Sequence, residues 1–261
     1  MIKDKNHFQL KMGLLSLISA IVIIGVFLIP AMKQDLSYHQ FSDQRFLLGI
    51  PNLLNVISNL AFFIIGLFGL IYLKTDKNAA VLASIRFNYS VFYFGVLLVA
   101  LGSGYYHLTP TNSSLVWDRL PMTVAFMAFF SIIISEFISE KLGELVFIPL
   151  IIIGLLSIWY WNYTEQNNIG DLRLYVLVQF LPMLLIPLIM LMFQSCFSHA
   201  KLYWYFLAMY GLAKIAETYD AAIYDYFQFI SGHSIKHILA SFGCIIFYIQ
   251  VKKRYLIKGK S

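Results

Sequence analysis

Long apolar runs recur along the whole chain, and they limit its fold more than any other feature. Hydrophobic residues make up 60% of the sequence and charged residues only 12%, which is about half the charged share of soluble domains. The runs approach or reach the ~17–25 residues that a helix needs to cross a bilayer. One soluble globule of 261 residues cannot hide so much apolar surface, so the solvent around this chain is lipid.

Lipid offers no hydrogen-bond partners to the backbone, so a chain that crosses it folds as helices or as a closed barrel. The runs here are continuous and do not alternate apolar and polar residues with a period of two, which excludes the barrel. The predicted fold class is therefore all-α, a polytopic membrane helix bundle.

The hydropathy pattern predicts eight membrane spans. The first exceeds the ~7–15 apolar residues of a signal peptide, so we expect a retained helix. Lys214 and Glu217 fall near the end of the seventh, and Pro182 and Pro187 lie inside the sixth, where kinks are expected. The spans are Met12–Met32, Asn52–Leu73, Phe87–Leu108, Asp118–Ser135, Leu145–Trp161, Leu172–Phe193, Tyr203–Ala216 and Ser234–Val251.

The distribution of Lys and Arg predicts the orientation of the bundle, because cytoplasmic loops carry an excess of both. With eight spans the termini share a side with the loops after spans two, four and six, and that side holds most of the basic residues. It carries Lys3, Lys5, Lys11, Lys74, Lys77, Arg86, Lys141, Lys201, Lys252, Lys253, Arg254, Lys258 and Lys260, against Lys33, Arg45, Arg119, Arg173 and Lys236 opposite. Both termini are predicted to be cytoplasmic, and the net charge of +6 does not indicate nucleic-acid binding.

Ionisable side chains within spans are expensive and mark candidate functional sites. Ser103 and His107 are four residues apart at the end of the third span, and His233 and His237 have the same spacing at the start of the last. Residues four apart share one face of a helix. The three histidines, and Asp118 at the start of the fourth span, are all predicted to reach the extracytoplasmic leaflet.

Three histidines with one open water position form a common catalytic zinc shell, so His107, His233 and His237 are predicted metal ligands. Bound zinc lowers the pKa of its water to ~7. Taken singly, each residue has a simpler interpretation: an interfacial histidine, a helix N-terminal charge for Asp118, or close packing for Ser103 between glycines. Their convergence at one depth favours the metal site.

These residues resemble the motifs of the CREST superfamily of membrane hydrolases, and most closely those of alkaline ceramidases. The likeness rests on S-x-x-x-H at Ser103–His107, the following Asp118, the late H-x-x-x-H at His233–His237, and N-x-x-S-N at Asn55–Asn59. It covers about residues 38–251 and implies a seven-transmembrane ceramidase-like domain there. Residues 1–37 would then be a basic N-terminus with an additional transmembrane helix, and residues 252–261 a basic cytoplasmic tail.

The resemblance implies a zinc ion held by the three histidines, Ser103 near the reacting carbonyl, and Asp118 handling the proton of the attacking water. Family members cleave the amide bond of ceramides to a sphingoid base and a fatty acid. The substrate would be a membrane lipid, ceramide or a related N-acyl lipid, and no obligate protein partner is inferred.

Calcium binding is doubtful, because the stretch that is acidic in alkaline ceramidases has one carboxylate here, in Tyr38–Arg45, and Asn52 replaces an expected acidic residue. Glu217, Asp220 and Asp225, with Asp43, are other acidic residues on that side, which we interpret as a solvated loop. Two further functions fit the same pattern, a receptor of the progestin and adipoQ type and an ion-coupled transporter. Cys196 and Cys244 are expected to be packed free thiols, since they form no CxxC pair.

Overall fold

The protein is a bundle of long antiparallel helices. The structure, a computed structural model, describes residues 2–257 and contains no β-strand in that range. The helices are α1 (Ile2–Leu28), α2 (Leu53–Ile57), α3 (Leu60–Thr75), α4 (Arg86–Leu108), α5 (Asn112–Phe137), α6 (Glu140–Gln166), α7 (Arg173–Met192), α8 (Leu202–Thr218), α9 (Asp220–Phe227) and α10 (Gly232–Lys253), with short 3-10 helices η1 (Leu36–His39) and η2 (Ala83–Ile85).

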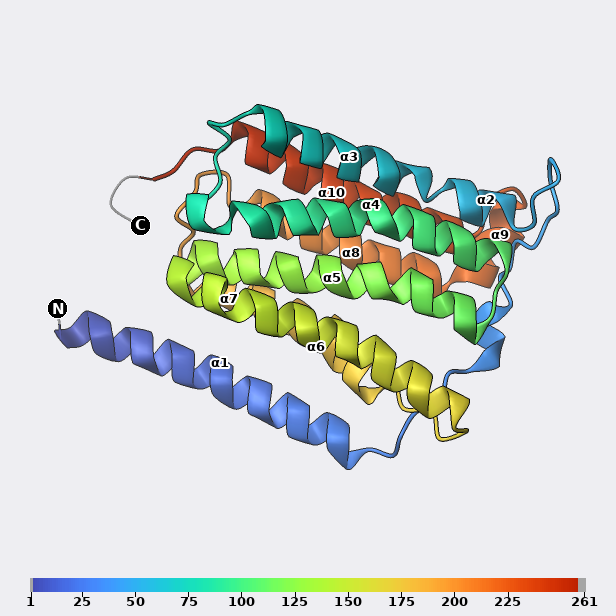
Figure 1. Cartoon of the computed structure of the whole chain (residues 1–261), viewed down its shortest axis with the longest axis horizontal. Coiled ribbons are helices and arrows are strands. Elements are labelled where there is room, and N and C mark those ends of the chain that lie inside the picture. Colours follow the sequence, from blue (N-terminus) through green and yellow to red (C-terminus); the bar gives the residue numbers. More distant parts are fainter. Residues whose placement is uncertain (1, 258–261) are drawn as a thin grey trace.

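The helices run alternately in opposite directions, so that α1 begins and α10 ends at the same end of the bundle (Figure 1). Among the described residues, seven helical segments are long and apolar enough to cross a membrane, and α8, with 17 residues, is slightly too short for that group. The all-α polytopic fold predicted from the sequence is confirmed.

Helix α5 occupies the centre of the bundle and α1 its edge. Figure 1 shows α5 between α4 on one side and α6 and α7 on the other, and α5 packs on all three. Most of its length is buried. By contrast, α1 packs mainly along α7, and Leu15 is the only buried residue of its Asn6–Leu28 part, as expected for a helix whose apolar side chains face lipid.

Several predicted spans differ from the helices. Helix α6 extends beyond the predicted Leu145–Trp161 at both ends, and three further differences have a local reason. Helix α5 begins at Asn112, well before the predicted start at Asp118, because Thr111 and Ser114 form a capping box that satisfies the first backbone N–H groups. Helix α1 ends at Leu28, two residues before Pro30, rather than at Met32. The predicted second span is interrupted between α2 and α3, at Ser58 and Asn59. Helix α9 was not predicted.

A buried ion pair closes the bundle at the end where α10 finishes. Arg254 Nη1 lies 2.8 Å from Glu136 Oε1, and neither side chain is exposed. The hydroxyl of Tyr203 donates to Glu136 Oε2 at 2.8 Å, and Tyr89 also donates to this carboxylate. Arg254, which the sequence assigns to a basic tail, is therefore a buried anchor between α5 and the segment after α10.

We predict that Glu136→Gln destabilises the fold, because it leaves the Arg254 charge buried without a counter-ion. Breaking one partner of a buried pair costs about 3–5 kcal/mol, which should appear as a lower melting temperature of the purified protein in detergent. Glu144→Gln, an exposed change of the same kind on α6, is the control. Equal melting temperatures for the two variants would contradict the anchoring role.

Candidate metal centre

Three histidine side chains meet at the end of the bundle opposite the ion pair. The last turn of α4 carries His107, and the first two turns of α10 carry His233 and His237. All three are buried, and their ring centroids lie 4.9–5.0 Å apart. One ligand atom from each lies within 4.8 Å of the others, so these residues could hold a metal ion.

The spacing of two of these rings fits a shared tetrahedral ion. The Nε2 atoms of His107 and His237 face each other at 3.4 Å. Two histidine nitrogens bound at ~2.0–2.1 Å to one tetrahedral zinc would lie about 3.3 Å apart. Imidazole is also the nitrogen ligand that zinc prefers in proteins. Donor type and spacing therefore agree.

Two polar side chains at the helix break orient the ring of His237. Ser58 Oγ lies 2.8 Å and Asn59 Nδ2 3.4 Å from His237 Nδ1, and Ser58 also donates to the carbonyl oxygen of Asn55. These contacts occupy Nδ1 and direct Nε2 of His237 toward His107. Such orienting hydrogen bonds from the second ring nitrogen accompany nearly all metal-binding histidines.

Asparagines at the start of the second span hold the two histidine-bearing helices together. Asn52 donates to the carbonyl oxygen of His107 at 2.8 Å. The buried Asn55 accepts from the hydroxyl of Ser234 at 2.7 Å and from that of Ser231 at 3.3 Å. Asn52 and the N-x-x-S-N segment together thus fix the end of α4 and the start of α10 relative to each other.

A lysine and two carboxylates surround His233. Lys236 Nζ donates to His233 Nε2 at 3.1 Å and pairs with Glu217 at 2.8 Å. Glu217 also pairs with Lys214 at 2.8 Å. Asp220 accepts the backbone N–H of His233 at 2.6 Å. Glu217 and Asp220 therefore do not belong to a solvated loop, as the sequence suggested, but support the start of α10.

The chain between α1 and α2 covers the centre from outside. The ring of Phe41 packs against those of His107 and His233, with centroids 4.7 and 4.8 Å away. The hydroxyl of Tyr38 donates to Glu217 at 3.3 Å. Burial and the neighbouring Glu217 carboxylate raise the pKa of Tyr38, so the hydroxyl of Tyr38 stays protonated and donates. In the same covering segment, the Arg45 guanidinium pairs with Asp43 and lowers the pKa of its carboxyl group.

Ser103 and Asp118 face each other where α4 and α5 come closest. Their side chains are neighbours, and both are buried. Gly102 makes the approach possible, because a Cβ there would lie 1.9 Å from the carbonyl oxygen of Trp117. Asp118 stands six residues into α5, which rules out the interpretation as a charge at the helix N-terminus.

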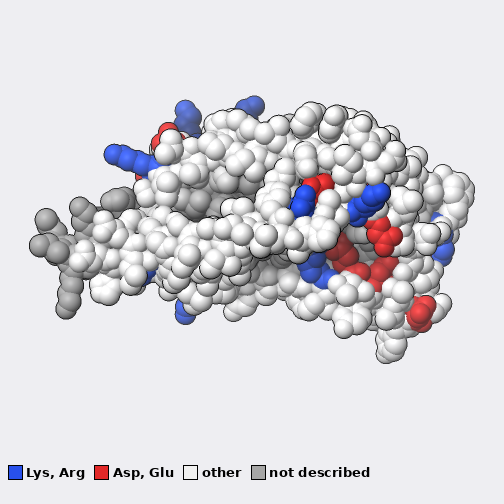
Figure 2. Space-filling view, turned by 90° about the horizontal axis from the view of Figure 1, so that it is seen from below, with Lys and Arg blue, Asp and Glu red and all other residues white. Residues whose placement is uncertain are grey.

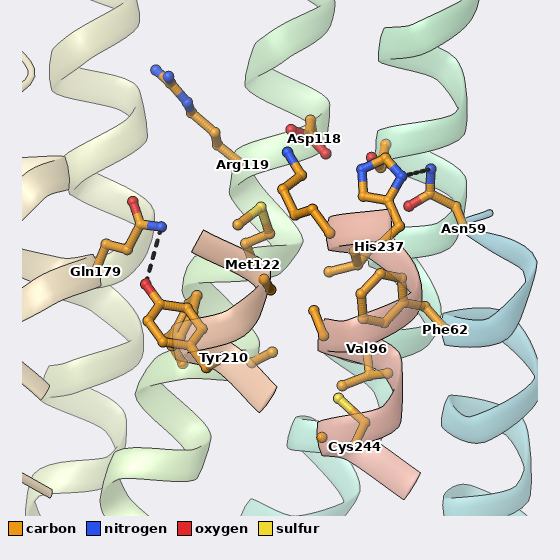
Figure 3. A pocket seen from close by; sticks show the side chains of 18 of the residues that line it. Asn59, Phe62, Val96, Asp118, Arg119, Met122, Gln179, Tyr210, His237 and Cys244 are labelled. Carbon is orange, nitrogen blue, oxygen red and sulfur yellow. Dashed lines mark hydrogen bonds between the residues drawn. The ribbon is translucent and has the colours of Figure 1, made fainter. Parts of the chain in front are cut away.

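A cavity of about 250 Å³ runs from these residues into the bundle. Figure 3 shows His237, Asp118 and Arg119 at one end of it and Cys244 and Val96 farther along. Charged groups line only the first end, and the rest is apolar apart from Gln179 and Tyr210, which hydrogen-bond each other. In Figure 2, acidic and basic side chains gather around a hollow far from the chain termini.

Sequence reasoning brought the histidines, Ser103 and Asp118 to one end, and the structure places them there. Of the histidines, only His237 lines the cavity together with Ser103 and Asp118. The sequence placed Ser58 in the N-x-x-S-N motif and Asp220 among the acidic residues of that side, but it did not predict that either contacts the histidine-bearing helix. The contact of Lys236 was not predicted either, although Lys236 lies three residues after His233 on the same helix.

Cys196 and Cys244 are free and buried, as expected.

Comparison with known proteins identifies one family. The family model described as Ceramidase matches residues 49–258. This range contains every residue of the histidine centre, its partner asparagines and the cavity-lining parts of α3 to α10, and it leaves out α1. None of the curated proteins matches the chain.

We predict that the histidine cluster binds a metal. His107→Ala, His233→Ala and His237→Ala should each remove the bound metal, because the two remaining imidazoles are too few ligands to retain it. Mass spectrometry of the metal content of the purified protein measures this. His7→Ala, an exposed histidine on α1, should keep the full content. A His233→Ala protein with unchanged metal would refute the assignment.

We also predict opposite effects at two nearby glycines of α4. Gly102→Ala should lower the melting temperature, since its methyl group would overlap the backbone of α5. Gly104→Ala meets no atom within 4 Å and should be neutral or stabilising, because alanine favours a helix by ~1 kcal/mol over glycine. If both variants melt alike, close packing at Gly102 does not hold α4 and α5 together.

Proposed function

The chain belongs to the ceramidase family, and on this premise we propose that it is a zinc-dependent membrane hydrolase that cleaves the amide bond of ceramide or a related N-acyl lipid. Three buried histidines stand beside a serine and an aspartate at the polar end of an apolar cavity, and this observation carries the proposal. The family match favours this function over a receptor or an ion-coupled transporter.

The three histidines would hold the ion. Zinc at this position supplies a Lewis acid that polarises a carbonyl and makes water a nucleophile at neutral pH. The chain's own contribution begins with desolvation. Phe41 covers the centre from outside and the buried helices surround it from within, so that charges on the reacting groups are poorly screened and interact strongly.

Asp118 is the proposed proton carrier. Its carboxylate accepts a proton from the attacking water as the oxygen bonds to the carbonyl carbon of the lipid amide. When the carbon–nitrogen bond breaks, Asp118 returns this proton to the leaving amine. The products are a fatty acid and a free amine. Ser103, next to Asp118, is placed to donate its hydroxyl hydrogen to the carbonyl oxygen while negative charge develops there.

The shape of the cavity supports a lipid substrate. Its deeper walls are apolar side chains from several helices, such as Phe62, Phe92, Val96, Phe129 and Phe206. They would surround an acyl chain, while the amide stays at the polar end. With both termini in the cytoplasm, as the lysine and arginine distribution predicts, the reaction would take place at the extracytoplasmic face.

The test is fatty-acid release from ceramide by the purified protein. Asp118→Asn should lower kcat by about 10²–10⁴-fold, and Ser103→Ala by about 10²-fold if it stabilises the oxyanion. Both variants should keep their metal, since neither residue belongs to the ligand set. Ser157→Ala, a buried serine of α6 that does not line the cavity, is the control.

Full turnover by Asp118→Asn would refute the assigned role of this residue. Wild-type protein that carries metal but releases no fatty acid from ceramide or from a mixed lipid extract would refute the proposed function itself.

A further inference from the structure

Arg119 is a buried cation with no carboxylate partner. Its side chain lines the cavity and is 6% exposed. Within the described residues, no Asp or Glu oxygen lies within ion-pairing distance of it. Nη2 donates to Gln34 Oε1 at 2.7 Å, and Nη1 has no hydrogen-bond partner. A buried charged donor without an acceptor destabilises the fold. A ligand with an anionic group would supply the acceptor that Nη1 lacks.

Aromatic rings hold the guanidinium in place without neutralising it. Its centre lies 4.6 Å from the ring centroids of both Trp161 and Tyr175, and 5.6 Å from that of Tyr38. Cation–π contacts of this kind stabilise the charge and restrict the orientation of the side chain. None of these contacts gives Nη1 a hydrogen-bond acceptor, so this nitrogen is the donor that an anion would bind.

The other cations at this end of the cavity are already paired. Lys214 and Lys236 share the carboxylate of Glu217. The charged residues that line the cavity are three cations, Arg119, Lys214 and Lys236, and two acids, Asp118 and Glu217. Their charges sum to +1, from three positive and two negative groups. Of the three lining cations, Arg119 is the one without a carboxylate counter-ion.

The position of Arg119 relates it to the amine half of the substrate. It follows Asp118 directly on α5, and in Figure 3 the Arg119 side chain and His237 lie on opposite sides of Asp118. An amide that reacts between Asp118 and the histidines, with its acyl chain in the apolar part, would extend the group on its nitrogen toward Arg119.

We propose that Arg119 is a specificity-determining residue that selects N-acyl lipids whose amine half bears an anionic group, a carboxylate or a phosphate. The planar fork of arginine suits both anions, which it can bind through two parallel hydrogen bonds. This inference rests on the proposed amide hydrolysis for its link to turnover, but its binding component stands independently of it.

The test uses three lipids with the same acyl chain and the same amide. N-palmitoylserine carries a carboxylate, N-palmitoylserinol a neutral hydroxymethyl group in its place, and N-palmitoylserinol phosphate a phosphate. Wild-type protein should cleave one or both anionic lipids with kcat/KM about 10- to 100-fold above that of the neutral one. The carboxylate and phosphate arms show which anion is preferred.

Arg119→Gln should remove this preference by lowering kcat/KM for the anionic lipids alone, and Arg119→Lys, which keeps the charge but loses the fork, should fall between. Arg173→Gln is the matched control, because Arg173 pairs with Asp171 and does not line the cavity. Melting temperatures of all variants report whether they fold, and the wild-type preference is measurable without any variant.

Equal wild-type kcat/KM for the neutral and anionic lipids would overturn the inference without contradicting the proposed hydrolysis. An equal loss of kcat/KM on all three lipids in Arg119→Gln would overturn it in the same way. If no lipid is cleaved, the proposed hydrolysis fails for this class, and binding of the radiolabelled lipids decides. Tighter binding of the anionic lipids that disappears in Arg119→Gln supports the inference, whereas equal binding overturns it.

Discussion

The Nε2 atoms of His107 and His237 face each other at 3.4 Å, and both side chains are buried. Ser58 and Asn59 contact Nδ1 of His237, so Nε2 is the ring nitrogen directed at His107. Two such nitrogens can bind one cation, and the third imidazole, His233, could add a further ligand. The ends of α4 and α10 and the broken second span are held in the positions that this contact requires.

The two ends of the bundle differ in how their buried charged groups are paired. At one end, Glu136 and Arg254 neutralise each other and two tyrosine hydroxyls complete their hydrogen bonding, so nothing is left for a ligand. At the other end, Nη1 of Arg119 and Nδ1 of His107 are buried without partners. Unsatisfied groups of this kind destabilise a fold. They also occur at Tyr93 and, near Arg254, at Gln250, so the end suited to binding is marked by the three histidines and the cavity rather than by unsatisfied atoms alone.

The sequence predicted the membrane spans because hydropathy is a property of each segment alone. It also predicted that His107, Asp118 and His237 share one leaflet, because only the parity of the spans was needed. It could not predict the start of α5, where Thr111 and Ser114 cap each other, since apolar periodicity begins later. Nor could it show that Arg119 faces Trp161 and Tyr175, because that depends on how α5 is rotated against α6 and α7.

The placement of the centre at the helix ends follows from what hydrolysis of a lipid demands. Water must reach the amide, yet the acyl chain gains from leaving water, by about 0.8 kcal/mol for each buried methylene. A site deep in the bundle would deny access to water, and one in the loops would have no apolar walls. Here the charged side chains line only one end of the cavity. Aromatic and aliphatic residues from the following turns of the same helices line the rest. One set of helices therefore supplies both environments, with Asp118 and Ser103 at the boundary between them.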